Sequence, residues 1–173
     1  MVPSYPAEAD AVEGIRGLGF DPISLHASTA FDLLRITALL SDEFDRALEE
    51  QTGVGLSETL VLVQLMFAEG RIKMAELADT LVVTRGGISK IVDRLVGSGL
   101  VERVPSEDDR RVVFAVVTDD GRALVRKCQP IFDEIAQRRL VDVAAPAEWL
   151  TFADLVGRIS CNNPGWEPPH RLG

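Results

Sequence analysis

The feature that most constrains the fold is a change in the apolar pattern at Gly99. Before it, the segment from Arg85 to Ser98 places apolar residues at the spacing of one helix face, namely Ile88, Ile91, Val92 and Leu95. After it, Leu100–Val104 and Val112–Val117 are short β-branched runs separated by a charged turn at Pro105–Asp109. The sequence therefore predicts an amphipathic helix followed at once by a β-hairpin.

Helices are predicted on both sides of this unit. Ser24 is the expected N-cap of a long helix that runs to about Glu50. Further helices are expected at Ser57–Ala68, at Met74–Thr80, at Asp119–Val143 with a kink before Pro130, and from Pro146 onward. The short helix, the turn at 81–83 and the helix from Arg85 form a helix-turn-helix. The predicted fold class is therefore mainly α with a small β-hairpin.

The length of 173 residues fits one ordinary domain with a helical extension. Composition and helix breakers divide the chain into five segments: a flexible N-terminal arm at 1–23, a first long helix at 24–55, the helix-turn-helix and hairpin at 56–118, C-terminal helices at 119–160 and a tail at 161–173.

Charge is distributed unevenly along the chain. The protein has 18 basic and 27 acidic residues, and its net charge of −9 taken alone argues against a nucleic-acid partner. Residues 71–127, however, carry eleven basic and nine acidic side chains, whereas residues 1–70 carry three and twelve. Only the middle third is not acidic, and it holds the helix-turn-helix and the hairpin.

Several kinds of chemistry lack their residues in this sequence. Cys128 and Cys161 form no CxxC pair, the two histidines stand alone near opposite ends, and no phosphate-binding glycine motif occurs. We therefore expect no metal, no cofactor and no enzymatic activity. No long apolar run and no signal peptide are apparent, so we expect no membrane association and a cytoplasmic location.

The second helix of the helix-turn-helix has the features of a DNA-reading element. Ser89 and Lys90 fall opposite the apolar stripe and can donate to base edges or phosphates. Further candidate contacts at its N-terminus are Thr84, Arg85, Gly86 and Gly87. The two glycines leave the first turn bare, so the backbone can approach a duplex, and the free N–H groups there favour a phosphate.

The hairpin tip supplies a second element. Arg110 and Arg111 directly precede the apolar strand, and an arginine on a projecting β-ribbon fits the negative potential of a narrow minor groove. Asp109 is expected to orient Arg111 through a charge-assisted hydrogen bond. Arg110 is explained equally well as a second phosphate contact or as a solvated side chain.

The segment from Leu56 to Gly121 resembles the MarR family of winged helix-turn-helix transcriptional regulators. The matching stretches are Met74–Ala78, Thr84–Leu95, Gly99–Arg103, Asp108–Arg111 and Thr118–Gly121. The resemblance implies a homodimer built from the N- and C-terminal helices, with recognition helices in successive major grooves and wing arginines in the flanking minor grooves. It assigns Arg111 to a minor groove, and Ser89 and Lys90 to the contacts of the recognition helix.

The expected fold is therefore a winged helix-turn-helix core flanked by N- and C-terminal dimerisation helices. The expected function is a dimeric regulator that binds double-stranded DNA at a pseudo-palindromic operator, as a repressor relieved by a small-molecule effector. The sequence does not indicate which residues bind the effector. The alternative is a dimeric protein-interaction module of the anti-repressor kind, which uses the same fold without specific DNA readout.

Some residues have a structural interpretation that competes with a functional one. Cys128 is expected to pack as a small apolar residue, with a redox switch as the alternative. His26 is expected on a helix surface or at an interface, with a place in a ligand pocket as the alternative. Asp93 would repel phosphate and is expected to pair with Lys90 or Arg94 of its own helix.

Overall fold

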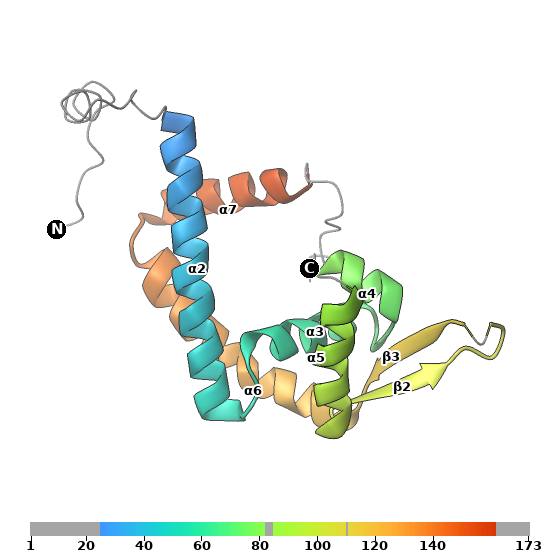
Figure 1. Ribbon diagram of the computed structural model, residues 1–173. Coiled ribbons are helices and arrows are strands. Elements are labelled where there is room, and N and C mark those ends of the chain that lie inside the picture. The colour runs from blue at the N-terminus through green and yellow to red at the C-terminus, as the bar shows by residue number, and fades with distance from the viewer. Residues whose placement is uncertain (1–24, 82–84, 110, 162–173) are drawn as a thin grey trace, which may run out of the picture. The chain divides into compact units, whose positions relative to one another are not determined.

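The computed structural model describes residues 25–81, 85–109 and 111–161 (Figure 1). Its elements are α2 (Leu25–Thr52), α3 (Leu56–Phe67), β1 (Arg71–Lys73), α4 (Met74–Thr80), α5 (Arg85–Gly97), β2 (Val101–Pro105), β3 (Val113–Val117), α6 (Asp119–Ala136), the π-helix η1 (Gln137–Val141) and α7 (Pro146–Cys161). The predicted N-terminal arm, the cap at Ser24 and the C-terminal tail from 162 lie outside the described residues.

The chain divides into two compact units, residues 1–43 and residues 44–173. The described part of the first unit is the α2 segment up to Glu43, which exposes large apolar side chains at Phe31, Leu34 and Leu39. The second unit holds the end of α2 and all the later elements. Its hairpin of β2 and β3 extends beyond α5 (Figure 1).

The prediction of a mainly helical fold with a small β element is confirmed, and the helix-turn-helix and hairpin lie where the periodicity put them. The strand β1 was not predicted. It pairs antiparallel with β3, so the sheet has three strands in the order β1-β3-β2. The strand has only three residues, and Ile72 stands between two charged ones, so the sequence lacks the β-branched run by which a strand is predicted.

The main core lies where α3, α4, α5 and the sheet meet. Fully or almost fully buried side chains from all four contribute to it, among them Leu62, Leu65, Leu77, Val92, Leu95, Val101 and Ala115. Because α3 packs against α5, α6 and the sheet, it is buried on several sides, as its nearly continuous apolar sequence predicts. This core fixes the orientation of α5 and the root of the hairpin together.

The end of α5 and the start of α6 are both closed by local hydrogen bonds. Gly99 has a φ of +73°, which lets the Leu100 N–H donate to the Leu95 carbonyl oxygen at 2.9 Å and stops α5. The Thr118 hydroxyl accepts a hydrogen bond from the Gly121 N–H at 3.1 Å. The predicted cap at Thr118 is thus confirmed, and the chain turns from β3 into α6 without a linker.

The start of α3 is capped from another helix. Its N-cap, Gly55, has no side chain to offer, and the carboxylate of Asp45 in α2 accepts the Leu56 N–H at 2.7 Å instead. A carboxylate at this position also interacts favourably with the helix dipole. The α2–α3 corner is therefore held by a side chain eleven residues earlier in the chain.

A smaller core joins the end of α2 to α6. Leu48, Cys128, Ile131 and Ile135 are buried there, and the rings of Phe44 and Phe132 stack with centroids 4.7 Å apart. Cys128 is 1% exposed and packs as the small apolar residue that the sequence predicts. Burial keeps this thiol from solvent, which disfavours the redox alternative. The side chain of His26 lies outside the described residues.

Helix α6 continues through Pro130 and gives way to a π-helical turn at Gln137–Val141. The predicted helix to Val143 is thus present to Val141, with its last turn wound more widely than an α-helix. The kink before Pro130 stays a prediction.

Gly121→Ala is expected to destabilise the protein. A Cβ at Gly121 would collide with the backbone carbonyl oxygen of Leu100 and lie 2.8 Å from Cγ2 of Val117. Because the site is buried, we expect the free energy of unfolding to fall by about 1–3 kcal/mol. Urea denaturation at fixed protein concentration measures this.

The matched control is Gly97→Ala, on the exposed side of α5, where a Cβ meets no atom within 4 Å. It should leave the free energy of unfolding unchanged or raise it by about 0.5–1 kcal/mol, because alanine favours a helix over glycine. An equal loss in both variants would contradict the packing described at Gly121.

Candidate nucleic-acid interface

Helix α5 turns its polar face outward because its opposite face is buried. Ile88, Val92 and Leu95 are at most 1% exposed, and Ile91 is half-buried. Lys90 is exposed on the other side and pairs with no side chain in the part of the chain that the structure describes. The predicted division of α5 into an inner and an outer face is confirmed.

The first turn of α5 is open at Gly86. This residue is exposed, and a Cβ placed on it would meet no atom within 4 Å. Packing within the described residues therefore does not require glycine at this position, whereas Gly87 is half-buried. Thr84 and the side chain of Arg85 lie outside the described residues, so their predicted roles stay predictions.

Ser89 is half-buried and bonded to the wing, the hairpin of β2 and β3. The Nη2 atom of Arg103 in β2 donates to the carbonyl oxygen of Ser89 at 3.2 Å and to its Oγ at 3.1 Å. The same nitrogen lies 2.9 Å from Oδ1 of Asp93. Arg103 thus joins the middle of the wing to two successive turns of α5.

The expectation that Asp93 pairs within its own helix is wrong. Asp93 pairs with Arg103 of β2, and Arg94 pairs with Glu58 of α3, Nε to Oε1, at 2.6 Å. Both partners come from other elements because α5 packs between α3 and β2, which bring Glu58 and Arg103 beside it.

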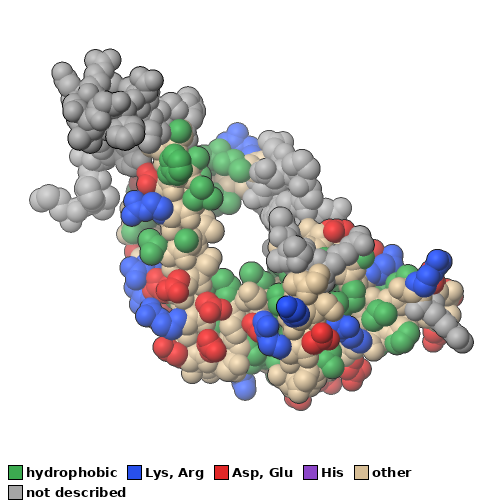
Figure 2. Space-filling view, in the orientation of Figure 1, with side chains coloured by type: hydrophobic (Ala, Val, Ile, Leu, Met, Phe, Trp, Pro, Cys, Tyr) green, Lys and Arg blue, Asp and Glu red, His purple; other side chains and the backbone are tan. Residues whose placement is uncertain are grey.

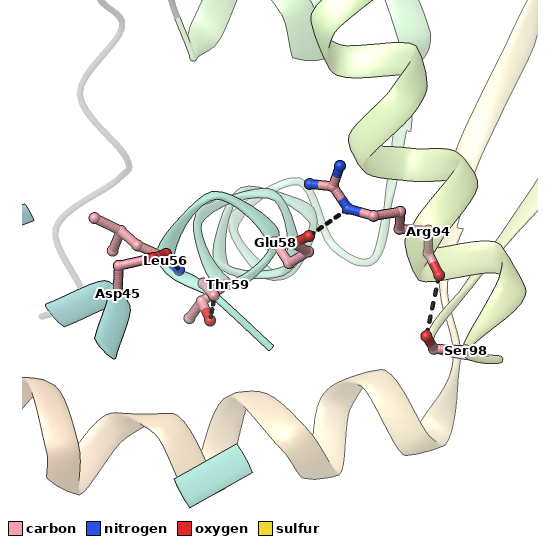
Figure 3. Close-up of polar contacts among 7 residues, drawn as sticks. Asp45, Leu56, Glu58, Thr59, Arg94 and Ser98 are labelled. Atoms are coloured by element: carbon pink, nitrogen blue, oxygen red, sulfur yellow. Dashed lines mark hydrogen bonds and ion pairs between the residues drawn. The ribbon is translucent and has the colours of Figure 1, made fainter. Parts of the chain in front are cut away.

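The Glu58–Arg94 pair ties α5 to α3 (Figure 3). In the same view the side chain of Asp45 lies beside Leu56 at the start of α3. The Asp45 contact with Leu56 and the Arg94 contact with Glu58 are thus both made to the first turn of α3. The Glu58 side chain is 16% exposed and that of Arg94 is 59% exposed, so solvent screens the pair only in part. The position of the outward face of α5 therefore depends on α3 as well as on the apolar core.

The wing tip is organised around one carboxylate. Asp109 accepts the backbone N–H of Arg111 at 2.9 Å, its Nε–H at 3.2 Å and an Nη2–H at 3.4 Å. These bonds, the backbone bond first and the guanidinium bond second, lower the pKa of Asp109 below its ordinary value of 3.8. The predicted support of Arg111 by Asp109 is present, and the Arg111 side chain remains 91% exposed. Arg110 lies outside the described residues.

A hollow of about 370 Å³ lies between the wing, the start of α4 and the first turns of α5. We call it the basic groove; its lining includes Lys73, Ser89, Arg103 and Arg111. Basic side chains, with acidic ones between them, are visible over α5 and toward the wing tip (Figure 2). Each basic residue of the groove is paired with a carboxylate. Lys73 pairs with Glu76 at 3.0 Å, and the partners of Arg103 and Arg111 are those described above.

Two members of the basic groove, Lys73 and Arg103, were missed by sequence reasoning. Lys73 lies on the strand that was not predicted. Arg103 could have been found from the alternation of its strand, because it shares a face with the buried Val101 and is thereby placed on the side of the sheet that packs against α5.

Within 25–81, 85–109 and 111–161, no three residues among His, Cys, Asp and Glu are grouped so that they could hold a metal ion. In the same ranges, every helix is too short or too polar to cross a lipid bilayer.

Comparison with known proteins gives a consistent result. The MarR family model matches residues 52–112. The HTH-type transcriptional repressor Mb2911 of Mycobacterium bovis is 30% identical over 122 residues, which cover 70% of this chain and 86% of that protein. The chain belongs to the MarR family. It spans 60% of the length of the Salmonella multiple antibiotic resistance proteins MarR, to which it is 33% identical over 86 residues.

Solved structures of the MarR family have the same fold. The MarR-family regulator AbsC of Streptomyces coelicolor superposes with a TM-score of 0.69 at 27% identity, over 79% of this chain and 93% of AbsC. A mutant of Escherichia coli MarR, solved in complex with operator DNA, superposes with a TM-score of 0.62 at 26% identity, over 79% of this chain and 99% of that one.

Arg111→Ala is expected to raise the pKa of Asp109 only part of the way to its ordinary value. The substitution removes the guanidinium bonds but keeps the backbone N–H, which is the larger cause of the lowered pKa. Carboxyl-carbon NMR titration of Asp109 measures the change. Arg126→Ala on α6 is the control and should leave this pKa unchanged; an equal pKa in wild type and Arg111→Ala would contradict the contact.

Proposed function

We propose that this MarR-family protein is a transcriptional regulator that binds double-stranded DNA as a homodimer. The observation that carries the proposal is the basic groove with its two flanks. Next to Ser89 of the groove, Lys90 is exposed on the outer face of α5, and at the wing tip Arg111 is exposed with its guanidinium held by Asp109. A helix of this kind fits a major groove, and an arginine on a ribbon fits the adjacent minor groove.

The roles of the segments follow from this arrangement. We assign residues 56–118 to DNA binding, and residues 24–55 and 119–160 to dimerisation.

In the DNA-binding segment, Ser89 and Lys90 are the base or phosphate contacts of the recognition helix, with Thr84, Arg85, Gly86 and Gly87 at its N-terminus. Arg111, supported by Asp109, enters the minor groove, and Arg110 is a further phosphate contact. The complex of E. coli MarR with operator DNA supports this assignment by similarity.

Each compact unit exposes apolar side chains that an isolated subunit would leave in water. On α7 these are Leu150, Phe152, Leu155, Val156 and Ile159, and on α2 they include Phe31, Leu34 and Leu39. Exposed apolar surface of this extent marks an association surface. We infer that a second copy of the chain covers both faces, because a pseudo-palindromic operator requires two recognition helices about 34 Å apart.

The proposed regulation is repression that a small-molecule effector relieves. A ligand can release DNA only if it binds better to a dimer whose recognition helices have the wrong separation. Similarity to a protein named as a transcriptional repressor, Mb2911, supports the direction of control. The effector-binding residues are unassigned.

Leu150→Ser is expected to weaken dimerisation. Leu150 is 69% exposed on α7, so the change leaves the subunit core intact while it removes apolar area twice from a symmetric interface. We expect the dissociation constant of the dimer to rise about tenfold or more. Sedimentation equilibrium measures it.

Thr151→Ser, at the exposed neighbouring position, is the matched control and should not change the dissociation constant. A wild-type protein that remains monomeric at micromolar concentration would overturn the dimeric function. Unchanged association of Leu150→Ser would remove α7 from the interface.

The function is tested by capture of sheared genomic DNA with the purified full chain, followed by sequencing and titration of the recovered duplex at several salt concentrations. Arg111→Ala should weaken binding to this duplex broadly and lower the slope of log K against log salt by about one unit per subunit. Arg126→Ala controls for the loss of one positive charge. Salt-insensitive or absent retention of DNA by the wild type would favour the protein-interaction alternative.

A further inference from the structure

Arg103 occupies a position in the sheet where an apolar residue is the rule. It lies opposite Ala115 of β3, in the same row as Ile72 of β1, and Ala115 is fully buried. The row begins in the core at Ala115, while the Arg103 side chain at its rim keeps 34% of its surface exposed. The guanidinium is thus placed on the side of the sheet that faces α5, and its partners there define its role.

Within the described residues, the hydrogen bonds and the ion pair of the Arg103 side chain are all to α5. One nitrogen, Nη2, reaches the carbonyl oxygen of Ser89, the hydroxyl of Ser89 and the carboxylate of Asp93, at 3.2, 3.1 and 2.9 Å. Ser89 and Asp93 are four residues apart and thus lie on one ridge of the helix. A single strand residue therefore fixes the separation and the rotation of the wing relative to the outer face of α5.

The contact also determines what Ser89 can offer to a ligand. A hydroxyl has one proton to donate and can also accept. The charged guanidinium occupies one of the two lone pairs of the Ser89 oxygen, which polarises the hydroxyl and makes it a stronger donor. Ser89 is then biased toward acceptors, which in a major groove are N7 and O6 of guanine, N7 of adenine and O4 of thymine.

We propose that Arg103 is a positioning residue that sets Ser89 as a hydrogen-bond donor toward base-edge acceptors and locks the wing to the recognition helix. The inference rests on the proposed DNA-binding function. It differs from a phosphate contact, because Arg103 acts through Ser89 and Asp93 and its charge is already matched by Asp93. Loss of Arg103 leaves the Asp93 carboxylate without its partner, so attraction to every duplex should fall by a small common factor, while binding to the preferred sequence should fall further.

The test uses the full-length protein and two duplexes: one selected by the wild type from a random-sequence pool, and a scrambled duplex of the same composition. Arg126→Gln, on the exposed surface of α6, also loses one positive charge and is the reference. Relative to it, Arg103→Gln should bind the selected duplex about tenfold more weakly, the loss expected for one base contact, and should bind the scrambled duplex about equally, with the same salt slope.

A double-mutant cycle shows whether Arg103 acts through Ser89. If it does, Ser89→Ala with Arg103→Gln should bind the selected duplex no more weakly than the worse of the two single variants. Thermal unfolding without DNA checks that each variant folds. If Arg103→Gln is unfolded, Asp93→Asn serves instead: it weakens the tie to α5 and should produce a smaller loss of the same selective kind.

Amide hydrogen exchange on the DNA-free protein provides a readout that does not depend on DNA binding. Arg103→Gln should speed exchange in β2, because the tie to α5 is broken, whereas Arg126→Gln should not. If the wild type shows no salt-sensitive binding to DNA, the proposed function fails, and the proposed contact of Ser89 with a base fails with it. The exchange measurement still shows whether Arg103 connects β2 to α5.

Two results would overturn the proposal while the DNA-binding function stands. An equal loss on both duplexes, with the salt slope lowered by about one unit per subunit, would make Arg103 a phosphate contact. Binding of Arg103→Gln indistinguishable from that of Arg126→Gln would show that Arg103 has no part in DNA readout.

Discussion

The structure depends on the burial of one face of α5. Val92 and Leu95 are packed against α3, α4 and the sheet so completely that α5 has a single rotational setting. The same core contains Val101 and Ala115, so the root of the wing is fixed by the contacts that fix the helix. The basic groove owes its shape to this shared core, because neither flank can move without disturbing the other.

Electrostatics refine this arrangement. The chain is strongly acidic, yet each arginine or lysine that lines the basic groove is paired with one carboxylate, such as Asp109 at the wing tip or Asp93 on α5. Exposed pairs of this kind add little stability. Their effect is geometric, because they restrict long side chains to a few rotamers, and less conformational entropy is then lost when a ligand takes up the groove.

Much of this was readable from the sequence because it rests on local patterns. The apolar stripe from Ile88 to Leu95, the stop at Gly99 and the cap at Thr118 each depend on residues within a few positions of one another. The link from Asp109 to Arg111 is equally local. What could not be predicted depends on tertiary register: the partner of Asp93 lies on a strand, β1 exists only because β3 is there to pair with it, and the cap of α3 comes from α2.

That last contact has a mechanical consequence. Since Gly55 contributes no capping side chain, the opening turn of α3 is satisfied only while the carboxylate of Asp45 remains at the corner between the two helices. Separating the two helices at this corner would leave the Leu56 amide unbonded and would disturb Glu58, the partner of Arg94, two residues further on in the same turn of α3. The end of α2 is therefore coupled to α5, because a displacement of α2 reaches α5 through two polar contacts as well as through the core that α3 and α5 share.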